Sequence, residues 1–360
     1  MTLPKTMRAM VTMGHGDLDQ MVLHPDWSRP DPAPGEVLIR VGACGLNNTD
    51  VNTRSGWYSK TVSDATTGGA FAEVGEDDPT WGGAPITFPR IQGADVCGEI
   101  VAVGDGVDPS RIGERVITDG WLRDPDDLLN KDKSGYFGSE RDGGFAEYTT
   151  TPARNALPIK SPLSDAELAT FSCSYSTAEG MLTRAQVSAG DTVLVPGASG
   201  GVGGALVQLA KRRGARVIAM AAEGKHEAVR ALGPDRILPR APGDLRAALG
   251  DEKITVVADV VGGPYWPHLI DILERGGRYT CSGAIAGPMV ALDLRTFYLR
   301  DLTFTGSTVI DPEVMPNIVR YIEAGEIKPA LAATYPLEEL REAQAAFIAK
   351  THSGNIVVTP

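Results

Sequence analysis

Two different patterns of hydrophobic and polar residues follow each other along the chain. From residue 6 to about 150, short apolar runs such as 37–41 and 98–103 alternate with turn-forming residues, which is typical of β-strands joined by loops. From about residue 160, apolar residues at helical spacing alternate with short β-branched runs, which predicts helices around a parallel sheet. From about residue 308 the first pattern returns, with a predicted helix at 337–350 and a predicted strand at 355–358.

Two polar segments without clear periodicity, residues 59–88 and 121–142, are predicted to be long loops. Such loops often determine substrate specificity, but a solvated surface insertion has the same composition. The capping-box pattern Ser164-Asp-Ala-Glu167 predicts the start of a helix before the α/β part.

A glycine-rich turn stands between a strand and a helix. The β-branched run 192–195 predicts a strand buried on both faces, and a second strand is predicted at 217–220 after the helix. Glycine lets the backbone approach a ligand closely, and the free N–H groups and dipole at the start of the helix favour a pyrophosphate. The order strand, turn, helix, strand predicts dinucleotide binding, and a turn without a ligand is the alternative. The residues expected at the cofactor are Gly197, Ser199, Gly200, Gly201, Val202 and Gly203.

Further strands of this sheet are predicted at 254–261, 277–282 and 302–305. In open parallel sheets, ligands lie outside the carboxyl ends of the strands. The small residues that follow two of these strands are therefore expected to line the cofactor groove, with ordinary loop chemistry as the alternative. They are Gly262-Gly263 at the end of the first strand and Ser282-Gly283-Ala284 at the end of the second. The residues expected at the cofactor here are Val261, Gly262, Ser282, Gly283 and Ala284.

The end of the second strand bears on the choice between NADPH and NADH. NAD-binding domains usually carry an acid there, but residues 220–222 include none, and Ala221 among them is expected to face the cofactor. Lys225 follows and would attract a 2′-phosphate, although it could also be a solvated residue at a helix start. The sequence favours NADPH, and Glu223 leaves NADH as the alternative.

Composition excludes several classes of function. The 360 residues suggest two domains, and the net charge of −12 argues against nucleic acid as a partner. No long apolar stretch predicts a membrane span, and residues 1–8 have no apolar signal core, so a cytoplasmic protein is expected. The cysteines Cys44, Cys97, Cys173 and Cys281 are scattered, which indicates neither a disulfide framework nor a structural zinc lobe.

Several motifs together resemble the medium-chain dehydrogenase/reductase superfamily, most of all its zinc-free quinone oxidoreductase and enoyl reductase branch. The resemblance covers nearly the whole chain. It is carried by residues 35–41, 45–50, 54–58, 93–104 and 143–148, by the glycine turn, and by the ending at 354–358.

The resemblance implies an α/β protein with a GroES-like β-barrel catalytic domain and a Rossmann domain with a doubly wound parallel sheet. The catalytic domain would comprise residues 1–155, completed by 308–360, and the Rossmann domain residues 156–307. The active site would lie in the cleft between them, and the protein would be a homodimer.

Zinc alcohol dehydrogenases of this superfamily hold the catalytic metal with a Cys, a His and usually a second Cys. The corresponding positions here are Asn47, Ala94 and Cys173, and none of the five histidines falls at them. One soft ligand does not make a tetrahedral zinc site. We therefore expect no catalytic zinc, with a non-standard site that includes Cys44, Cys97, Asp50 or Asp95 as the alternative.

Three residues are candidates for the chemistry. Tyr58 matches a tyrosine that serves as proton donor in enoyl reductase relatives, and Asn47 could donate a hydrogen bond to the substrate carbonyl or to the nicotinamide ribose. Thr177 matches a position beside the nicotinamide. The structural alternatives are a tyrosine at the rim of the cleft, a turn asparagine and a helix-packing threonine.

An α,β-unsaturated carbonyl needs no metal, because hydrogen-bond donors can stabilise the oxygen that becomes negative and an acid can protonate the α-carbon. The sequence therefore predicts an NADPH-dependent reductase that acts on a small molecule, either an activated C=C bond or a quinone. The alternatives are an alcohol dehydrogenase or carbonyl reductase with an atypical site, and a non-catalytic NADPH-binding sensor.

Overall fold

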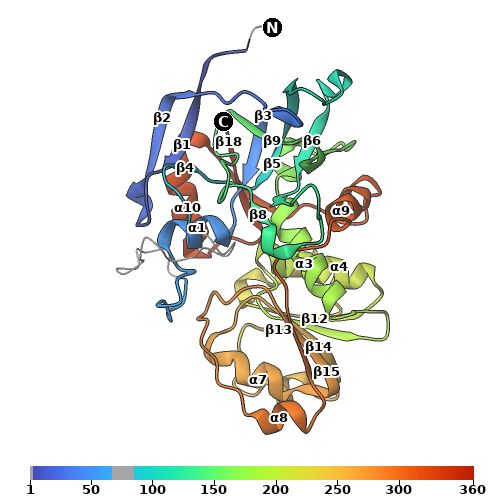
Figure 1. Cartoon of the computed structure of the whole chain (residues 1–360). Coiled ribbons are helices and arrows are strands. Elements are labelled where there is room, and N and C mark those ends of the chain that lie inside the picture. The colour runs from blue at the N-terminus through green and yellow to red at the C-terminus, as the bar shows by residue number, and fades with distance from the viewer. Residues whose placement is uncertain (1–2, 67–84) are drawn as a thin grey trace. The chain divides into compact units, whose positions relative to one another are not determined.

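The computed structural model describes residues 3–66 and 85–360, and these form two compact units (Figure 1). In the described part of the chain, the first unit comprises residues 3–62, 85–173 and 311–360, and the second comprises 63–66 and 174–310. The predicted domain limits stay a prediction. Among the described residues, no helix has both the length and the apolar character that crossing a membrane requires.

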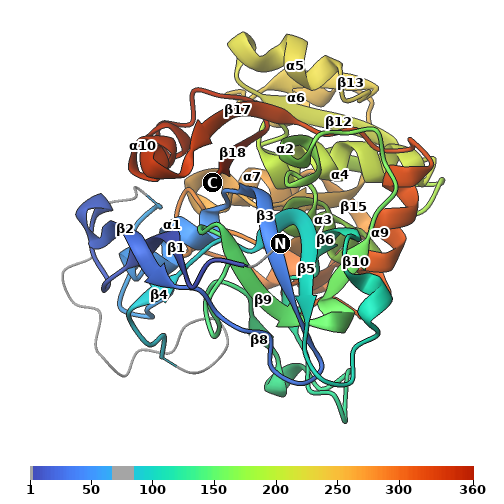
Figure 2. The same ribbon diagram turned by 90° about the horizontal axis from the view of Figure 1, so that it is seen from above.

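The first unit is built around a mainly antiparallel sheet. Strand β3 (Glu36–Gly45) is its centre: it pairs with β5 (Asp95–Val103) along one edge, and with β9 (Tyr148–Pro152) and then β18 (Asn355–Thr359) along the other. Figure 2 shows β9, β3 and β5 side by side. The strand order is β10-β6-β5-β3-β18-β17, so the C-terminal tail is part of this sheet.

Shorter elements complete the first unit. The remaining strands are β1 (Thr6–Thr12), β2 (Met21–Ser28), β4 (Arg90–Ile91), β6 (Arg115–Thr118), β7 (Trp121–Leu122), β8 (Gly135–Tyr136), β10 (Ala156–Pro158) and β17 (Leu331–Pro336). The helices are α1 (Asn48–Ser55), α2 (Asp165–Leu168), α9 (Val314–Glu323) and α10 (Leu340–Ala349), while α3 (Ser172–Arg184) begins in this unit and continues into the second. The predicted capping box is confirmed, because Ser164 and Glu167 bond each other's backbone N–H groups at the start of α2.

The second unit is a six-stranded sheet with the order β13-β12-β11-β14-β15-β16, and every pair in it is parallel. This is the doubly wound order of dinucleotide-binding folds, so the predicted fold class is confirmed. Its strands are β11 (Thr192–Val195), β12 (Arg216–Ala221), β13 (Arg236–Pro239), β14 (Ile254–Asp259), β15 (Leu273–Cys281) and β16 (Thr303–Gly306). Its helices besides α3 are α4 (Gly201–Arg212), α5 (His226–Arg230), α6 (Leu245–Leu249), α7 (Trp266–Asp271) and α8 (Leu294–Tyr298).

Alternation of side chains along the strands gives this sheet two apolar faces. Leu194, Ile218 and Val257 pack on one face with Leu249 of α6 and Trp266 of α7 in a single buried cluster. Helix α4 packs on the other face, and Figure 1 shows it on the side of the sheet opposite α7. Burial on both faces explains why these strands are continuous apolar runs in the sequence.

One loop prediction needs a correction. Residues 121–142 are not all loop, because β7 and β8 pair as a short antiparallel ladder between Trp121 and Tyr136. Strands of two residues have no detectable periodicity, so the residue pattern does not predict them. In the other predicted loop, residues 59–66 and 85–88 form no helix or strand, and 67–84 lie outside the described residues.

The glycine turn is held by close backbone packing. Gly197 adopts a φ of +66°, which favours glycine, and a Cβ on Gly203 would lie 2.2 Å from the Gly197 carbonyl oxygen. The first turn of α4 therefore rests directly on the end of β11.

We expect Gly203→Ala to lower the free energy of unfolding by about 3 kcal/mol, because the added methyl group meets rigid backbone rather than a movable side chain. Gly200→Ala is the matched control: its nearest neighbour would be 3.6 Å away, so we expect a change within about 0.5 kcal/mol. Urea unfolding of both variants measures this. Equal losses in the two variants would contradict the packing argument.

Candidate active site

In the first unit, the candidate residues lie at the two ends of α1. Asn47 is the residue that precedes the helix, and its backbone N–H donates to Asp50 Oδ2 at 2.8 Å. The other oxygen of Asp50 accepts from the Gly93 N–H at 3.2 Å. The buried Asp50 carboxyl therefore ties the start of α1 to the loop that leads into β5.

A second buried carboxyl, that of Asp95, lies beside this helix start. Its Oδ1 accepts the N–H of Cys173, a donor in the first turn of α3 that has no partner within the helix, at 3.0 Å. Burial raises the pKa of Asp50 and that of Asp95 to about 7, and the charge of Asp50 contributes to the shift at Asp95. No ion pair joins either carboxyl to a Lys or Arg among the described residues, so hydrogen bonds must stabilise both.

Tyr58 follows the other end of α1, two residues after Gly56 ends the helix at a φ of +77°. Its hydroxyl shares hydrogen bonds with the side chains of Thr49 and Asn52, and burial raises its pKa. Tyr58 is half-buried, and its raised pKa keeps the phenol a neutral donor at physiological pH. Asn47 and Tyr58 thus belong to one short helix.

The side chains around this helix do not fit a catalytic zinc ion. Among the described residues, no three His, Cys, Asp or Glu side chains converge on one point where a metal could bind. The three positions that hold zinc in metal enzymes of the family carry the amide of Asn47, the methyl group of Ala94 and the thiol of the half-buried Cys173. Burial also raises the pKa of the Cys44 and Cys97 thiols, which favours the protonated form over the thiolate that binds metals. The predicted absence of zinc stays a prediction.

In the second unit, the residues predicted at the cofactor lie at the carboxyl ends of β11, β12, β14 and β15, along one edge of the sheet. Asp259, the last residue of β14, is buried and accepts the Val261 N–H at 2.7 Å, the Gly262 N–H at 3.2 Å and the Tyr279 hydroxyl at 2.8 Å. It therefore fixes the loop that starts at Val261. The loop 282–287 packs on it, because the Ala286 N–H donates to the Val261 carbonyl at 2.8 Å.

Two cations follow adjacent strands of this edge. Lys225 is half-buried after β12, and burial and the neighbouring charge of Arg240 lower its pKa. Parallel pairing places Ala221 opposite Pro239, the residue before Arg240. Sequence reasoning missed Arg240, and the register of β12 and β13 is the signal that finds it.

The predicted catalytic residues are divided between the units. Asn47 and Tyr58 lie in the first, and Thr177 lies half-buried on α3 in the second. The predicted cofactor residues all lie in the second unit.

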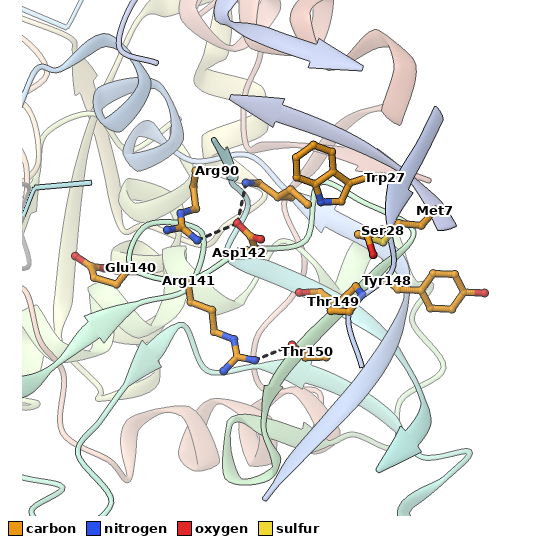
Figure 3. A pocket seen from close by; sticks show the side chains of 13 residues that line it. Met7, Trp27, Ser28, Arg90, Glu140, Arg141, Asp142, Tyr148, Thr149 and Thr150 are labelled. Atoms are coloured by element: carbon orange, nitrogen blue, oxygen red, sulfur yellow. Dashed lines mark hydrogen bonds and ion pairs between the residues drawn. The ribbon is translucent and has the colours of Figure 1, made fainter. Parts of the chain in front are cut away.

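A hollow of about 330 Å³ in the first unit contains none of the predicted site residues (Figure 3). Its charged lining is already paired: Arg90 contacts Asp142 at 2.9 Å, and Arg141 contacts Glu36 at 2.6 Å. These two arginines are therefore already neutralised by carboxylates.

Two family models match the chain, one to each main part. The "Alcohol dehydrogenase GroES-like domain" matches residues 33–161, and "Zinc-binding dehydrogenase" matches residues 201–324. A solved structure from Sinorhizobium meliloti 1021, provisionally assigned as an alcohol dehydrogenase, is 48% identical, covers 99% of this chain and 98% of its own, and has a TM-score of 0.89. The chain belongs to the medium-chain dehydrogenase/reductase superfamily.

Curated relatives of this superfamily member come from its quinone oxidoreductase and enoyl reductase branch. Acryloyl-coenzyme A reductase of Metallosphaera sedula is 28% identical over 98% of this chain and 100% of its own length. Quinone oxidoreductase of Rattus norvegicus is 27% identical over 94% and 93%. The chloroplastic NADPH-dependent alkenal/one oxidoreductase of Arabidopsis thaliana is 26% identical over 100% and 81%.

The raised pKa values of Asp50 and Asp95, about 7 each, predict how stability depends on pH. Unfolded Asp has a pKa near 3.9, so the folded protein binds more protons between roughly pH 4 and 7. The free energy of unfolding must therefore fall as pH rises through that window. We expect wild type to lose on the order of 1–3 kcal/mol between about pH 5 and pH 8.

Asp95→Asn should match wild type near pH 5 and exceed its stability near pH 8, because it removes a buried charge. Urea unfolding across this range measures both curves. Asp108→Asn, a change at an exposed carboxyl, is the control and should keep the wild-type slope. Parallel curves for Asp95→Asn and wild type would refute the assignment.

Proposed function

We propose that this protein is an NADPH-dependent oxidoreductase that reduces an activated C=C bond or a quinone without catalytic zinc. The observation that carries the proposal is the donor set around α1, which is the amide of Asn47 and the phenol of Tyr58. Of the three positions that hold zinc in metal enzymes of the family, only Cys173 carries a side chain that binds metal well. The names of the curated relatives agree with this reaction class.

The bound NADPH would supply the hydride. When hydride reaches the β-carbon of an enone or enoyl substrate, negative charge moves to the carbonyl oxygen. Asn47 Nδ2–H is suited to stabilise that oxygen, since a donor aimed at developing charge acts more strongly in a buried site. Tyr58 is suited to protonate the α-carbon, because its phenol is neutral and two side chains orient its hydroxyl.

The second unit fits the cofactor. Backbone N–H groups at Gly201 and Val202 start α4 and would face the pyrophosphate. Lys225 and Arg240 would hold a 2′-phosphate, and Ala221 ends β12 without the carboxyl that would repel it. These contacts support NADPH over NADH.

A carbonyl reductase or alcohol dehydrogenase is the second candidate. The Sinorhizobium meliloti structure, at 48% identity, carries that provisional name. Small-molecule substrates are common to both candidates. A homodimer and a cytoplasmic location are also part of the proposal, and light scattering of the purified protein would test the first.

The deciding assay follows NADPH absorbance with an α,β-unsaturated ketone and with its saturated counterpart. We expect consumption with the unsaturated ketone alone, and a decrease of about 10²-fold in kcat for Tyr58→Phe with unchanged NADPH affinity. Metal analysis of the same preparation should find no stoichiometric zinc. Turnover of the saturated ketone by zinc-loaded protein would instead establish the second candidate.

Cofactor preference has its own test. We expect Lys225→Ala and Arg240→Ala each to raise the KM for NADPH about tenfold, since each removes a charge-assisted contact. The KM for NADH should change less than twofold in both variants. Arg230→Ala, an exposed arginine on α5, is the matched control. Equal effects on the two cofactors would show that the pair does not hold the 2′-phosphate.

A further inference from the structure

We infer that Asp95 is a positioning residue that sets the orientation of the Asn47 carboxamide through a hydrogen bond from Asn47 Nδ2 to its free carboxyl oxygen. The inference rests on the proposed function, because it assigns how the donor to the substrate oxygen is held. Neither the family models nor the names of the relatives assign a role to Asp95.

The first observation is a complementary pair of buried atoms. Asn47 Nδ2 and Asp95 Oδ2 are both buried and both lack a partner that meets strict hydrogen-bond geometry. Their residues are 7% and 1% exposed. The two side chains are nonetheless neighbours, and the Asn47 amide lowers the pKa of Asp95 against the stronger effect of burial. A donor and an acceptor that are both costly to leave unpaired thus lie together.

The backbone holds the two residues in fixed positions. The register of β3 and β5 places Gly45 opposite Asp95, only two residues before Asn47. Gly45 has no room for a side chain, because a Cβ there would lie 2.2 Å from the Ala169 carbonyl oxygen and 3.2 Å from Asp95 Cβ. Asp50 then fixes the Asn47 backbone N–H at 2.8 Å. The Asn47 side chain in turn accepts the Asp50 backbone N–H in a capping box, so the backbone and the side chain of Asn47 are both held at the start of α1.

The other oxygen of Asp95 is already committed. Oδ1 accepts the Cys173 N–H at 3.0 Å, which fixes the plane of the carboxyl group. Oδ2 is left facing the Asn47 amide. An ionised Oδ2 attracts the NH₂ group and repels the amide oxygen, so it selects one of the two amide orientations. One N–H is then held by Asp95, and the second N–H is directed elsewhere as a fixed donor.

The experiment is a double-mutant cycle on the full chain, with kcat/KM for the unsaturated ketone measured at about pH 8. Asp95→Asn keeps the shape of the side chain and an acceptor for Cys173, but presents an NH₂ group to Asn47 and reverses the amide. We expect about a 100-fold loss for Asp95→Asn and a similar loss for Asn47→Ala, the lower end of the range seen for one missing oxyanion donor. In the Asn47→Ala background, Asp95→Asn should cost less than twofold.

Asp119→Asn is the matched control, since Asp119 is also a buried carboxyl in the first unit but contacts Arg123 at 2.6 Å. The fold-loss in kcat/KM that it causes should be the same in wild type and in the Asn47→Ala background, so that the two losses multiply. Losses that multiply for Asp95→Asn as well would overturn the inference and indicate a general structural role. The KM for NADPH should stay at the wild-type value in Asp95→Asn, and thermal unfolding at pH 8 should show no loss of stability.

The outcomes separate this inference from the proposed function. Wild type that consumes NADPH with neither unsaturated ketones and enoyl substrates nor quinones would overturn the proposed function itself. Wild-type activity that survives in Asn47→Ala would leave the reductase assignment in place, but would show that Asn47 is no donor and that Asp95 positions nothing.

Discussion

A carboxyl group that is buried without a cation must be held by N–H and O–H donors, and both units of this protein depend on that constraint. Asp50 and Asp95 hold the start of α1, the loop before β5 and the first turn of α3 in the first unit. Asp259 holds the loop after β14 in the second. Because removing these carboxyls from water is costly, each one fixes its donors firmly. The loops that carry the candidate residues are therefore held by backbone donors rather than by ion pairs.

The two units contribute different kinds of groups. The first offers neutral side-chain donors at the two ends of a single helix. The neighbouring acids Asp50 and Asp95 accept hydrogen bonds from backbone N–H groups. The second offers backbone N–H groups in a closely packed glycine turn, and a pair of cations after β12 and β13. This division matches a reaction in which a large anionic cofactor needs charge, whereas a small neutral substrate needs only hydrogen bonds.

Local patterns were sufficient to predict the strand at 192–195, the glycine turn and the parallel sheet. Burial on both faces requires a run of apolar residues, and close backbone packing requires glycine, so both can be recognised from residue type. Residues brought together by strand register cannot be recognised in this way. Arg240 lies beside the end of β12 only because Ala221 pairs with Pro239, and Asp95 lies near Asn47 only because Gly45 pairs with Asp95. Pairs of this kind depend on the alignment of distant segments, which one sequence does not reveal.

The buried thiols have a consequence for handling the protein. Cys44 and Cys97 both lie in the central sheet of the first unit, on the paired strands β3 and β5, and burial raises the pKa of each. A protonated thiol shielded from solvent reacts slowly with alkylating and oxidising reagents. Modification of either cysteine therefore requires the strands around it to separate. The rate at which a thiol reagent labels these cysteines then measures how often this sheet opens.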